Sequence, residues 1–315
     1  MSLGPLKAAM GVLIGTSLLT FVGPIVGELI ATLPPAFPRG DTNPWTELAL
    51  SYEEVVFPTT DGLMLRGWFI PTDRPNAPAI LYAHATAHDQ RSGLSLVSEF
   101  HAAGYHVLLF SYRGHALSDG NGWGFTYGDA ESKDVDAAVQ FLRETKGIRR
   151  IGAIGHSVGA VSIILSAARN PEIGAVAAVA PFNSVDEVWH TSRPALMPSF
   201  LLDLTLRLAE KRKGFNRNEI SPLEAVHRIA PRPLLVIHGM DDRRITEAQV
   251  RRLFEVAREP KALWLVDGAT HAGIRDVALG EMAPDVIAFF DAALRDQERP
   301  IARLSHSLTS EIIVR

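Results

Sequence analysis

The chain has 315 residues, and 47% of them are hydrophobic, which is enough for a sizeable packed core. Its formal net charge of −4 and its pI near 6.3 argue against a surface built to neutralise nucleic-acid phosphates, so we expect no nucleic acid among its partners. The sequence contains no cysteine, which excludes thiol nucleophiles, disulfides and cysteine-ligated metals.

The first element in the chain is an apolar run. Residues 8–27 carry no charge, and their number is what a helix needs to cross the hydrocarbon core of a bilayer. We expect an N-terminal hydrophobic helix within 1–33 that associates the protein with a membrane, followed by a proline-rich linker over 34–50. Lys7 favours a globular domain on the extracytoplasmic side. Two other interpretations stay open: a signal peptide cleaved from a secreted protein, and a buried or interfacial helix.

From residue 51 onward, short apolar runs alternate with longer amphipathic stretches, which is the pattern of a parallel sheet covered by helices. The runs at 53–57 and 63–70 flank an Asp-Gly turn signal and predict an antiparallel hairpin. The other predicted strands are 79–83, 106–110, 150–154, 174–180, 233–238 and 262–266. The predicted helices are 91–103, 129–145, 158–169, 246–257 and 281–297.

The alternation breaks once, at residues 181–222. This stretch is too long for a simple connection and contains apolar helical pieces of its own. We expect a helical lid inserted over one end of the sheet. The sequence therefore predicts one α/β domain over 51–297 that includes this insertion, and a C-terminal tail over 298–315.

The segment "GHSVG" at 155–159 fits the pattern Gly-x-Ser-x-Gly, between an apolar strand and an Ala/Ile-rich helix. A sharp strand-to-helix turn needs very small residues two places before and after the serine, and Gly155 and Gly159 meet that need on either side of His156 and Ser157. The glycine spacing does not match a phosphate-binding or dinucleotide-binding turn. We therefore expect Ser157 to be a nucleophile.

A serine hydroxyl needs a base to take its proton and a carboxylate to orient that base. Two apolar strands downstream are followed by suitable loops. The loop after "LLVIH" carries Asp241 and Asp242, and the loop after "LWLV" carries His271. The order Ser157, Asp242, His271 is the order expected with this type of turn.

These segments, together with "TTDGLMLRGWFIP", "ILYAHATAH" and "GYHVLLFSYRGHALSDG", resemble the α/β-hydrolase superfamily over about residues 55–290. More narrowly, they resemble the Bem46-like and prolyl-oligopeptidase-like serine hydrolases of bacteria. The resemblance implies an α/β-hydrolase fold with a mostly parallel sheet. It selects Asp242 as the acid, because that residue is the fourth after the histidine of "HG", and it leaves Asp186 as the other position where some members carry the acid.

The same resemblance implies an oxyanion hole made of two backbone N–H groups. One belongs to Val158, the residue after the serine, and the other to Thr86 in the loop after the first parallel strand. Ala85 departs from the family, which usually has glycine there. His84 and His88 lie four residues apart, but no third ligand type is near them, so we expect structural roles rather than a metal site.

The expected reaction is hydrolysis of a small-molecule carboxylic ester through an acyl-enzyme, with no metal or organic cofactor. A peptidase or amidase of the same fold and a membrane-tethered, non-catalytic binding protein are the alternatives. An apolar insertion favours a hydrophobic acyl group, unless its side chains simply pack it onto the body. Those side chains are Trp189, Leu196, Met197, Phe200, Leu201, Leu202, Leu204, Leu206 and Leu208.

Overall fold

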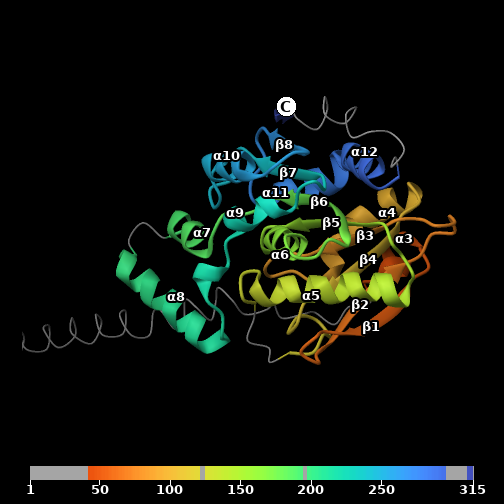
Figure 1. Ribbon diagram of the computed structural model, residues 1–315, viewed down its shortest axis with the longest axis horizontal. Helices are drawn as coiled ribbons and strands as arrows, with labels where there is room; N and C mark the ends of the chain where they lie inside the picture. Colours follow the sequence, from red (N-terminus) through yellow and green to blue (C-terminus); the bar gives the residue numbers. More distant parts are fainter. Residues whose placement is uncertain (1–41, 121–124, 194–196, 296–310, 315) are drawn as a thin grey trace, which may run out of the picture.

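The computed structural model describes residues 42–120, 125–193, 197–295 and 311–314, which form a twisted sheet between two layers of helices (Figure 1). The sheet has nine strands in the order β1-β2-β4-β3-β5-β6-β7-β8-β9. The strands are β1 (Glu53–Pro58), β2 (Met64–Ile70), β3 (Ala79–Ala83), β4 (His106–Ser111), β5 (Ile151–His156), β6 (Ile173–Val179), β7 (Leu234–Gly239), β8 (Lys261–Val266) and β9 (Glu311–Val314).

The sheet begins with the predicted hairpin, in which Glu53 pairs with Phe69 and Pro58 with Met64. Strand β2 also pairs antiparallel with β4, and each later neighbouring pair is parallel. The mostly parallel sheet with flanking helices is therefore confirmed. Because the inner strands run in one direction, their C-terminal ends meet at a single edge, where the loops that follow them can converge.

Strand β9 was not predicted. Residues 311–314 lie in the segment that the sequence assigns to a C-terminal tail, yet they pair with β8 from Leu263 to Val266. A run of four residues is too short to show a periodicity. Its place in the sheet depends on pairing with a strand that lies far from it in sequence.

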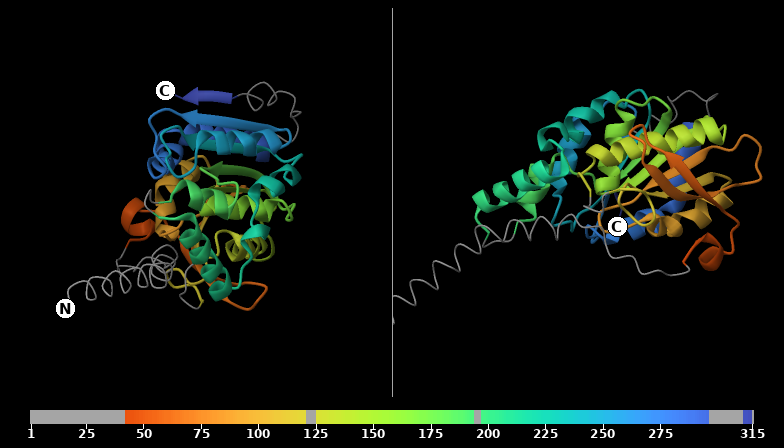
Figure 2. Two further views of the ribbon diagram at one scale, coloured as in Figure 1. Left: turned by 90° about the vertical axis from the view of Figure 1, so that its left-hand side faces the viewer. Right: turned by 90° about the horizontal axis from the view of Figure 1, so that it is seen from below.

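Helices cover both faces of the sheet (Figure 2). The strand side chains alternate between two apolar cores, so that Leu81 and Ala83 belong to one core and Ile80 and Tyr82 to the other. The helices are α3 (Pro44–Leu48), α4 (Leu94–Ala102), α5 (Asp129–Gln140), α6 (Val158–Ala167), α7 (Val185–Thr191), α8 (Ser199–Lys213), α9 (Pro222–Ala225), α10 (Glu247–Val256), α11 (Gly273–Asp276) and α12 (Ala283–Leu294). Single helical turns are η2 (Gln90–Gly93), η3 (Phe141–Thr145), η4 (Arg217–Glu219), η5 (Val226–Arg228) and η6 (Val277–Glu281).

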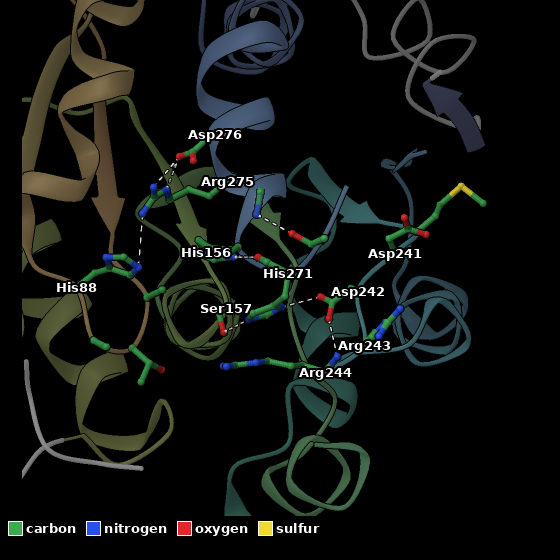
Figure 3. Close-up of a pocket in the computed structure, with 17 residues that line it drawn as sticks. His88, His156, Ser157, Asp241, Asp242, Arg243, Arg244, His271, Arg275 and Asp276 are labelled. Atoms are coloured by element: carbon green, nitrogen blue, oxygen red, sulfur yellow. Dashed lines mark hydrogen bonds and ion pairs between the residues drawn. The ribbon is translucent and has the colours of Figure 1, made fainter. Parts of the chain in front are cut away.

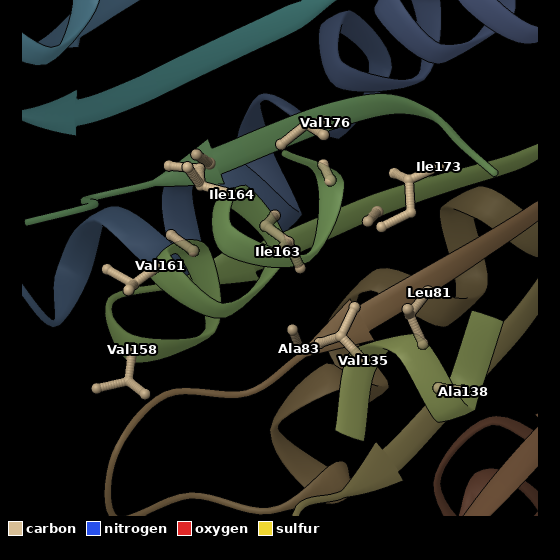
Figure 4. Close-up of a cluster of buried hydrophobic side chains, with 14 of the residues drawn as sticks. Leu81, Ala83, Val135, Ala138, Val158, Val161, Ile163, Ile164, Ile173 and Val176 are labelled. Carbon is tan, nitrogen blue, oxygen red and sulfur yellow. The ribbon is translucent and has the colours of Figure 1, made fainter. Parts of the chain in front are cut away.

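Helix α6 lies at the centre of the core that contains Leu81 and Ala83 (Figure 4). Its sequence VGAVSIILSA is buried on nearly every side, which explains why it is apolar all round rather than amphipathic. Val161 and Ile164 on this helix belong to the same cluster as Val135 of α5 and Val176 of β6. The helix that follows Ser157 is thus held rigidly by its surroundings.

The insertion at 181–222 contains α7, α8 and η4, and α8 stands off to one side of the sheet (Figures 1 and 2). Leu201, Leu202 and Leu206 turn inward and are buried, whereas Phe200 is 60% exposed. Much of the apolar character of this segment is therefore used to pack it onto the body, as the alternative interpretation expects. Leu196 lies outside the described residues.

No helix within the described ranges is both long enough and apolar enough to span a bilayer. The run at 8–27, on which the membrane prediction rests, lies outside those ranges.

Candidate active site

A pocket of about 1060 Å³ opens at the C-terminal edge of the sheet (Figure 3). Its walls come from the loops that follow β3, β5, β7 and β8, and they include Thr86, Ser157, Asp242 and His271. The structure therefore brings together four residues that are far apart in sequence and that the sequence analysis selected for their chemistry.

Ser157 is the single residue between β5 and α6. Its backbone has φ 54° and ψ −117°, a conformation that a residue with a side chain adopts at a cost. Its N–H donates to the carbonyl of Val179 at 2.9 Å, and its carbonyl accepts from Val161 at 3.0 Å. These bonds, and the buried helix behind them, hold the strained turn in place.

The two glycines of the turn permit close approach of backbone segments. A methyl group on Gly155 would lie 2.6 Å from the backbone of Gly159, and one on Gly159 would collide with the carbonyl oxygen of Ala83. Gly159 thus allows the start of α6 to lie against the end of β3. That contact places the loop containing Thr86 beside the first amides of α6.

The N–H of Val158 is the first in α6, so it has no carbonyl one turn earlier to bind. Neither it nor the N–H of Thr86 has a hydrogen-bond partner within the part of the chain that the structure describes. Thr86 lines the pocket and Val158 directly follows the pocket residue Ser157, and free amides beside a reacting carbonyl can bind a negatively charged oxygen.

The loop that carries Thr86 is shaped by a tight turn. His88 N–H donates to Ala85 O at 3.3 Å, and Ala87 has φ 60°, in the left-handed region. Ala85 is buried without a positive φ, so the conformation there does not require the glycine that the family usually has. The left-handed backbone conformation occurs two residues later, at Ala87.

His84 fixes the start of that loop. Its Nε2 accepts from the N–H of Tyr112 at 3.3 Å, and its Nδ1 donates to the carbonyl of Ala85 at 2.9 Å. Burial holds the pKa of His84 well below its ordinary value, so the ring is neutral. This structural role agrees with the sequence interpretation. Across the described ranges no group of three or more His, Cys, Asp or Glu side chains could hold a metal ion.

Asp242 is buried in the loop after β7. Its Oδ2 lies 2.6 Å from His271 Nδ1, and its Oδ1 accepts from the N–H groups of Arg244 at 2.7 Å and Ile245 at 3.0 Å. Burial alone raises the pKa of Asp242, but the hydrogen bond and charge of His271 and the two amides outweigh it, so the pKa is lowered. The carboxylate is therefore ionised near neutral pH.

The other carboxylates considered for this position lie elsewhere. Asp241 is exposed, and its side chain is drawn on the side of its loop away from His271 (Figure 3). Asp186 in α7 forms an ion pair with Arg217, with a distance of 3.1 Å between Oδ1 and Nη1.

His271 lies between Ser157 and Asp242 and contacts both side chains. Its Nε2 lies 3.1 Å from Ser157 Oγ, while its Nδ1 faces Asp242. Since Asp242 is an ionised acceptor, Nδ1 carries the proton and Nε2 is free to accept one from the hydroxyl. The arrangement can therefore move a proton from serine to imidazole.

A further histidine, His156, supports this geometry, although its sequence position indicates only a place in the turn around Ser157. His156, at the end of β5, donates from Nε2 to the backbone carbonyl of His271 at 2.9 Å, and the two rings lie 5.2 Å apart. Burial, and the neighbouring His271 ring, lower the pKa of His156 to about 3. The ring is neutral at physiological pH and ties the loop of His271 directly to the strand that carries Ser157.

The comparisons with known proteins agree with this fold. Residues 74–223 match the family described as serine aminopeptidase, S33, a range that includes Ser157 and ends before Asp242 and His271. YqkD of Bacillus subtilis, an uncharacterized protein, is 31% identical over 224 residues, which are 69% of this chain and 72% of YqkD. The chain belongs to the α/β-hydrolase superfamily of serine hydrolases.

Two more comparisons show how widely this hydrolase fold is shared. Human ABHD12B is 27% identical over 205 residues, which cover 61% of this chain and 53% of that protein. The Pyrococcus furiosus esterase Pf2001 superposes with a TM-score of 0.68 at 24% identity, over 83% of this hydrolase and 100% of the esterase chain. At that identity the likeness shows the fold alone.

Proposed function

We propose that this hydrolase cleaves carboxylic esters of small molecules through an acyl-enzyme intermediate. The observation that carries the proposal is the unbroken array from Ser157 Oγ through both nitrogens of His271 to Asp242, with distances of 3.1 and 2.6 Å. Donor and acceptor roles along it are consistent, because an ionised carboxylate fixes the tautomer that leaves Nε2 able to accept a proton.

In the first half of the reaction, His271 Nε2 takes the Ser157 proton while Oγ bonds to the ester carbonyl carbon. The carbonyl oxygen becomes an anion, and we assign its binding to the N–H groups of Val158 and Thr86. The bond to the alkoxy oxygen then breaks as the imidazolium returns its proton to that oxygen, which releases the alcohol and leaves Ser157 acylated.

In the second half, water takes the place of the serine. His271 accepts a proton from the water, whose oxygen adds to the acyl carbon, and the bond to Oγ breaks as the proton passes to Oγ. The free acid leaves and the serine is restored.

A peptidase is the second candidate, because the matching family is described as a serine aminopeptidase. An enzyme that removes an N-terminal residue needs a carboxylate to bind the substrate's ammonium group. Within the described pocket wall, Asp242 is bound by His271 and Asp276 by Arg275, and Asp241 is drawn away from Ser157 (Figure 3). This distribution favours an ester over a peptide.

We propose an apolar acyl group and a lid role for residues 181–222. One support is that α7 starts shortly after β6, and β6 pairs with β5, the strand that leads to Ser157. The other is that the exposed ring of Phe200 leaves apolar surface on α8. None of the residues that line the described pocket comes from this segment. Residues 181–222 can therefore contact only a substrate that extends beyond the pocket.

A membrane location completes the proposal. Its support is the uncharged run at 8–27, which would keep the hydrolase close to lipid-soluble esters. Carbonate extraction of membranes from cells that make the full chain tests it. We expect the protein in the pellet with its N-terminus intact, and a mature N-terminus after residue 30 would indicate a cleaved signal instead.

The test of the proposed function is a panel of p-nitrophenyl esters from acetate to palmitate, with aminoacyl p-nitroanilides as the peptidase arm. We expect ester hydrolysis that Ser157→Ala abolishes. Ser166→Ala is the matched control, because Ser166 is a buried serine on the same helix whose hydroxyl donates to Asp136 at 2.6 Å. Anilide cleavage without ester cleavage would identify a peptidase, and no turnover of either class would favour a binding protein.

A further inference from the structure

The pocket around Ser157 is rich in charged side chains. Among the residues that line it are three carboxylates, Asp241, Asp242 and Asp276, and three guanidinium groups, those of Arg243, Arg244 and Arg275. Charges that are paired with each other contribute little to the recognition of a ligand. A substrate can be recognised only by a group that has no such partner.

Two of the carboxylates and one guanidinium already have hydrogen-bond partners within the protein. Asp242 binds His271, and Asp276 accepts from Arg275 Nε at 2.8 Å and from Nη2 at 2.6 Å. Arg275 Nη1 also lies 3.5 Å from His88 Nε2. Burial, and the neighbouring Arg275 charge, lower the pKa of His88, so this histidine adds no charge at neutral pH.

Arg244 and Arg243 differ from Arg275 in that neither guanidinium has an ion-pair or hydrogen-bond partner within the described residues. They also differ from each other in direction. In Figure 3, Arg244 extends from its loop toward the side of the pocket where Ser157 lies, whereas Arg243 and Asp241 are drawn on the opposite side of that loop. Of the two free cations, Arg244 is the one that faces the reacting serine.

The base of Arg244 is fixed by the catalytic array itself. Its backbone N–H donates to Asp242 Oδ1 at 2.7 Å, so the residue starts from a position set by the carboxylate that orients His271. Arg244 is exposed, so its guanidinium is accessible to an anionic ligand. A planar guanidinium binds a carboxylate or a phosphate through two parallel hydrogen bonds.

We propose that Arg244 recognises an anionic group on the substrate, so that the preferred esters carry a carboxylate or a phosphate a few bonds from the scissile carbonyl. The inference rests on the proposed function and makes its substrate class more specific. Combined with an apolar acyl group, it describes an amphiphilic ester with one anionic group near the reacting centre.

Two pairs of substrates test the proposal and locate the charge. On the acyl side, mono-p-nitrophenyl adipate is compared with p-nitrophenyl hexanoate, which has a methyl group in place of the carboxylate. On the alcohol side, 1-butyrylglycerol 3-phosphate is compared with 1-butyrylglycerol. For each pair the measured quantity is the ratio of kcat/KM for the anionic ester to kcat/KM for the neutral ester.

We expect that ratio to exceed about tenfold in at least one pair, as one charge-assisted contact at a partly exposed site allows. Arg244→Gln keeps the backbone N–H that Asp242 accepts and should reduce the ratio to about one, and Arg244→Lys should keep part of the ratio. Arg243→Gln is the matched control, since it removes the same charge from the neighbouring position and should keep the ratio.

Equal kcat/KM values within both pairs would overturn the proposal. Equal losses in Arg244→Gln and Arg243→Gln would also overturn it, because they would show a general effect of surface charge. Both results leave hydrolysis of the neutral esters intact. Failure of the proposed function is distinguishable, because then no ester of either kind is hydrolysed and the inference fails with it.

Discussion

The loops that hold Ser157, Asp242 and His271 differ sharply from the insertion at 181–222 in how the chain fixes them. The loops after β7 and β8 are joined by backbone hydrogen bonds, with Met240 N–H donating to Val266 O at 2.9 Å and Asp241 N–H to Ala269 O at 3.0 Å. These bonds tie the backbone of the two loops directly to the edge of the sheet.

The insertion is held mainly by side chains. Gln249 Nε2 in α10 donates to Thr191 Oγ1 at 3.0 Å, and Arg252 Nη2 contacts Glu187 Oε2 at 3.3 Å. Such contacts are partly exposed and individually contribute about 1 kcal/mol or less. The site is thus fixed by backbone hydrogen bonds at the sheet edge, whereas the insertion is attached by side-chain contacts and lines no part of the described pocket.

The largest effect should come from the carboxylate of the site. Asp242→Asn keeps the size of the side chain but removes the ionised acceptor that fixes the tautomer of His271, so we expect kcat for p-nitrophenyl butyrate to fall by about 10⁴-fold. Asp241→Asn, one residue earlier and exposed, should stay within about twofold of the parent. A larger loss of kcat in Asp241→Asn than in Asp242→Asn would show that the assignment of Asp242 as the acid is wrong.

An intermediate effect should come from His156. Replacing it by leucine removes the donor to the His271 carbonyl and loosens the base, so we expect kcat to fall by about 10- to 100-fold with little change in KM. His156→Gln, which keeps an N–H donor, should recover part of the loss. Equal activity of the leucine variant and the parent would show that the strand, rather than this bond, positions His271.

The same residue links the site to stability. Its pKa is about 3 in the folded protein and near 6.5 in the unfolded chain, so the unfolded chain binds more protons between these values. Stability is therefore fully present above about pH 6.5 and falls with decreasing pH, by at most about 1.4 kcal/mol per pH unit from this group.

Urea unfolding of the parent and of His156→Gln at about pH 7 and pH 5 isolates this contribution, because the other buried histidines are common to both. We expect the parent to lose more stability than the variant as the pH is lowered. The lowered pKa of Asp242 acts in the same direction at lower pH, since a carboxylate with a depressed pKa loses its contribution only as it becomes protonated. Identical losses in both proteins would contradict the assignment.

The smallest effect should come from the insertion. Phe200→Ser removes an exposed ring from α8, so we expect hydrolysis of p-nitrophenyl acetate to change by less than about twofold. If residues 181–222 act as a lid, palmitate hydrolysis should fall by several times more than acetate hydrolysis. A parallel Leu117→Ser variant, at another exposed apolar residue, should affect neither ester, and equal effects of both variants would remove the lid from the account.

Much of this molecule could be predicted from local sequence. The hairpin, the inner strands and the turn at Ser157 follow from apolar runs and glycine spacing, because each is fixed by neighbouring residues. The convergence of Asp242 and His271 on Ser157 follows from their place after parallel strands. The roles of His156 and Arg244 depend on contacts across the site, and no local pattern distinguishes them from an ordinary buried histidine and a surface arginine.

The central claim is that Ser157 is an activated nucleophile, and a fluorophosphonate probe tests it most directly, because such a probe reacts covalently with serines whose hydroxyl is activated by a base. The measurement is the intact mass of the labelled protein followed by mapping of the modified peptide. The account predicts a single adduct on Ser157, absent from Ser157→Ala, greatly slowed in His271→Ala and unchanged in Ser166→Ala. No adduct, or an adduct that persists in folded Ser157→Ala, would contradict it.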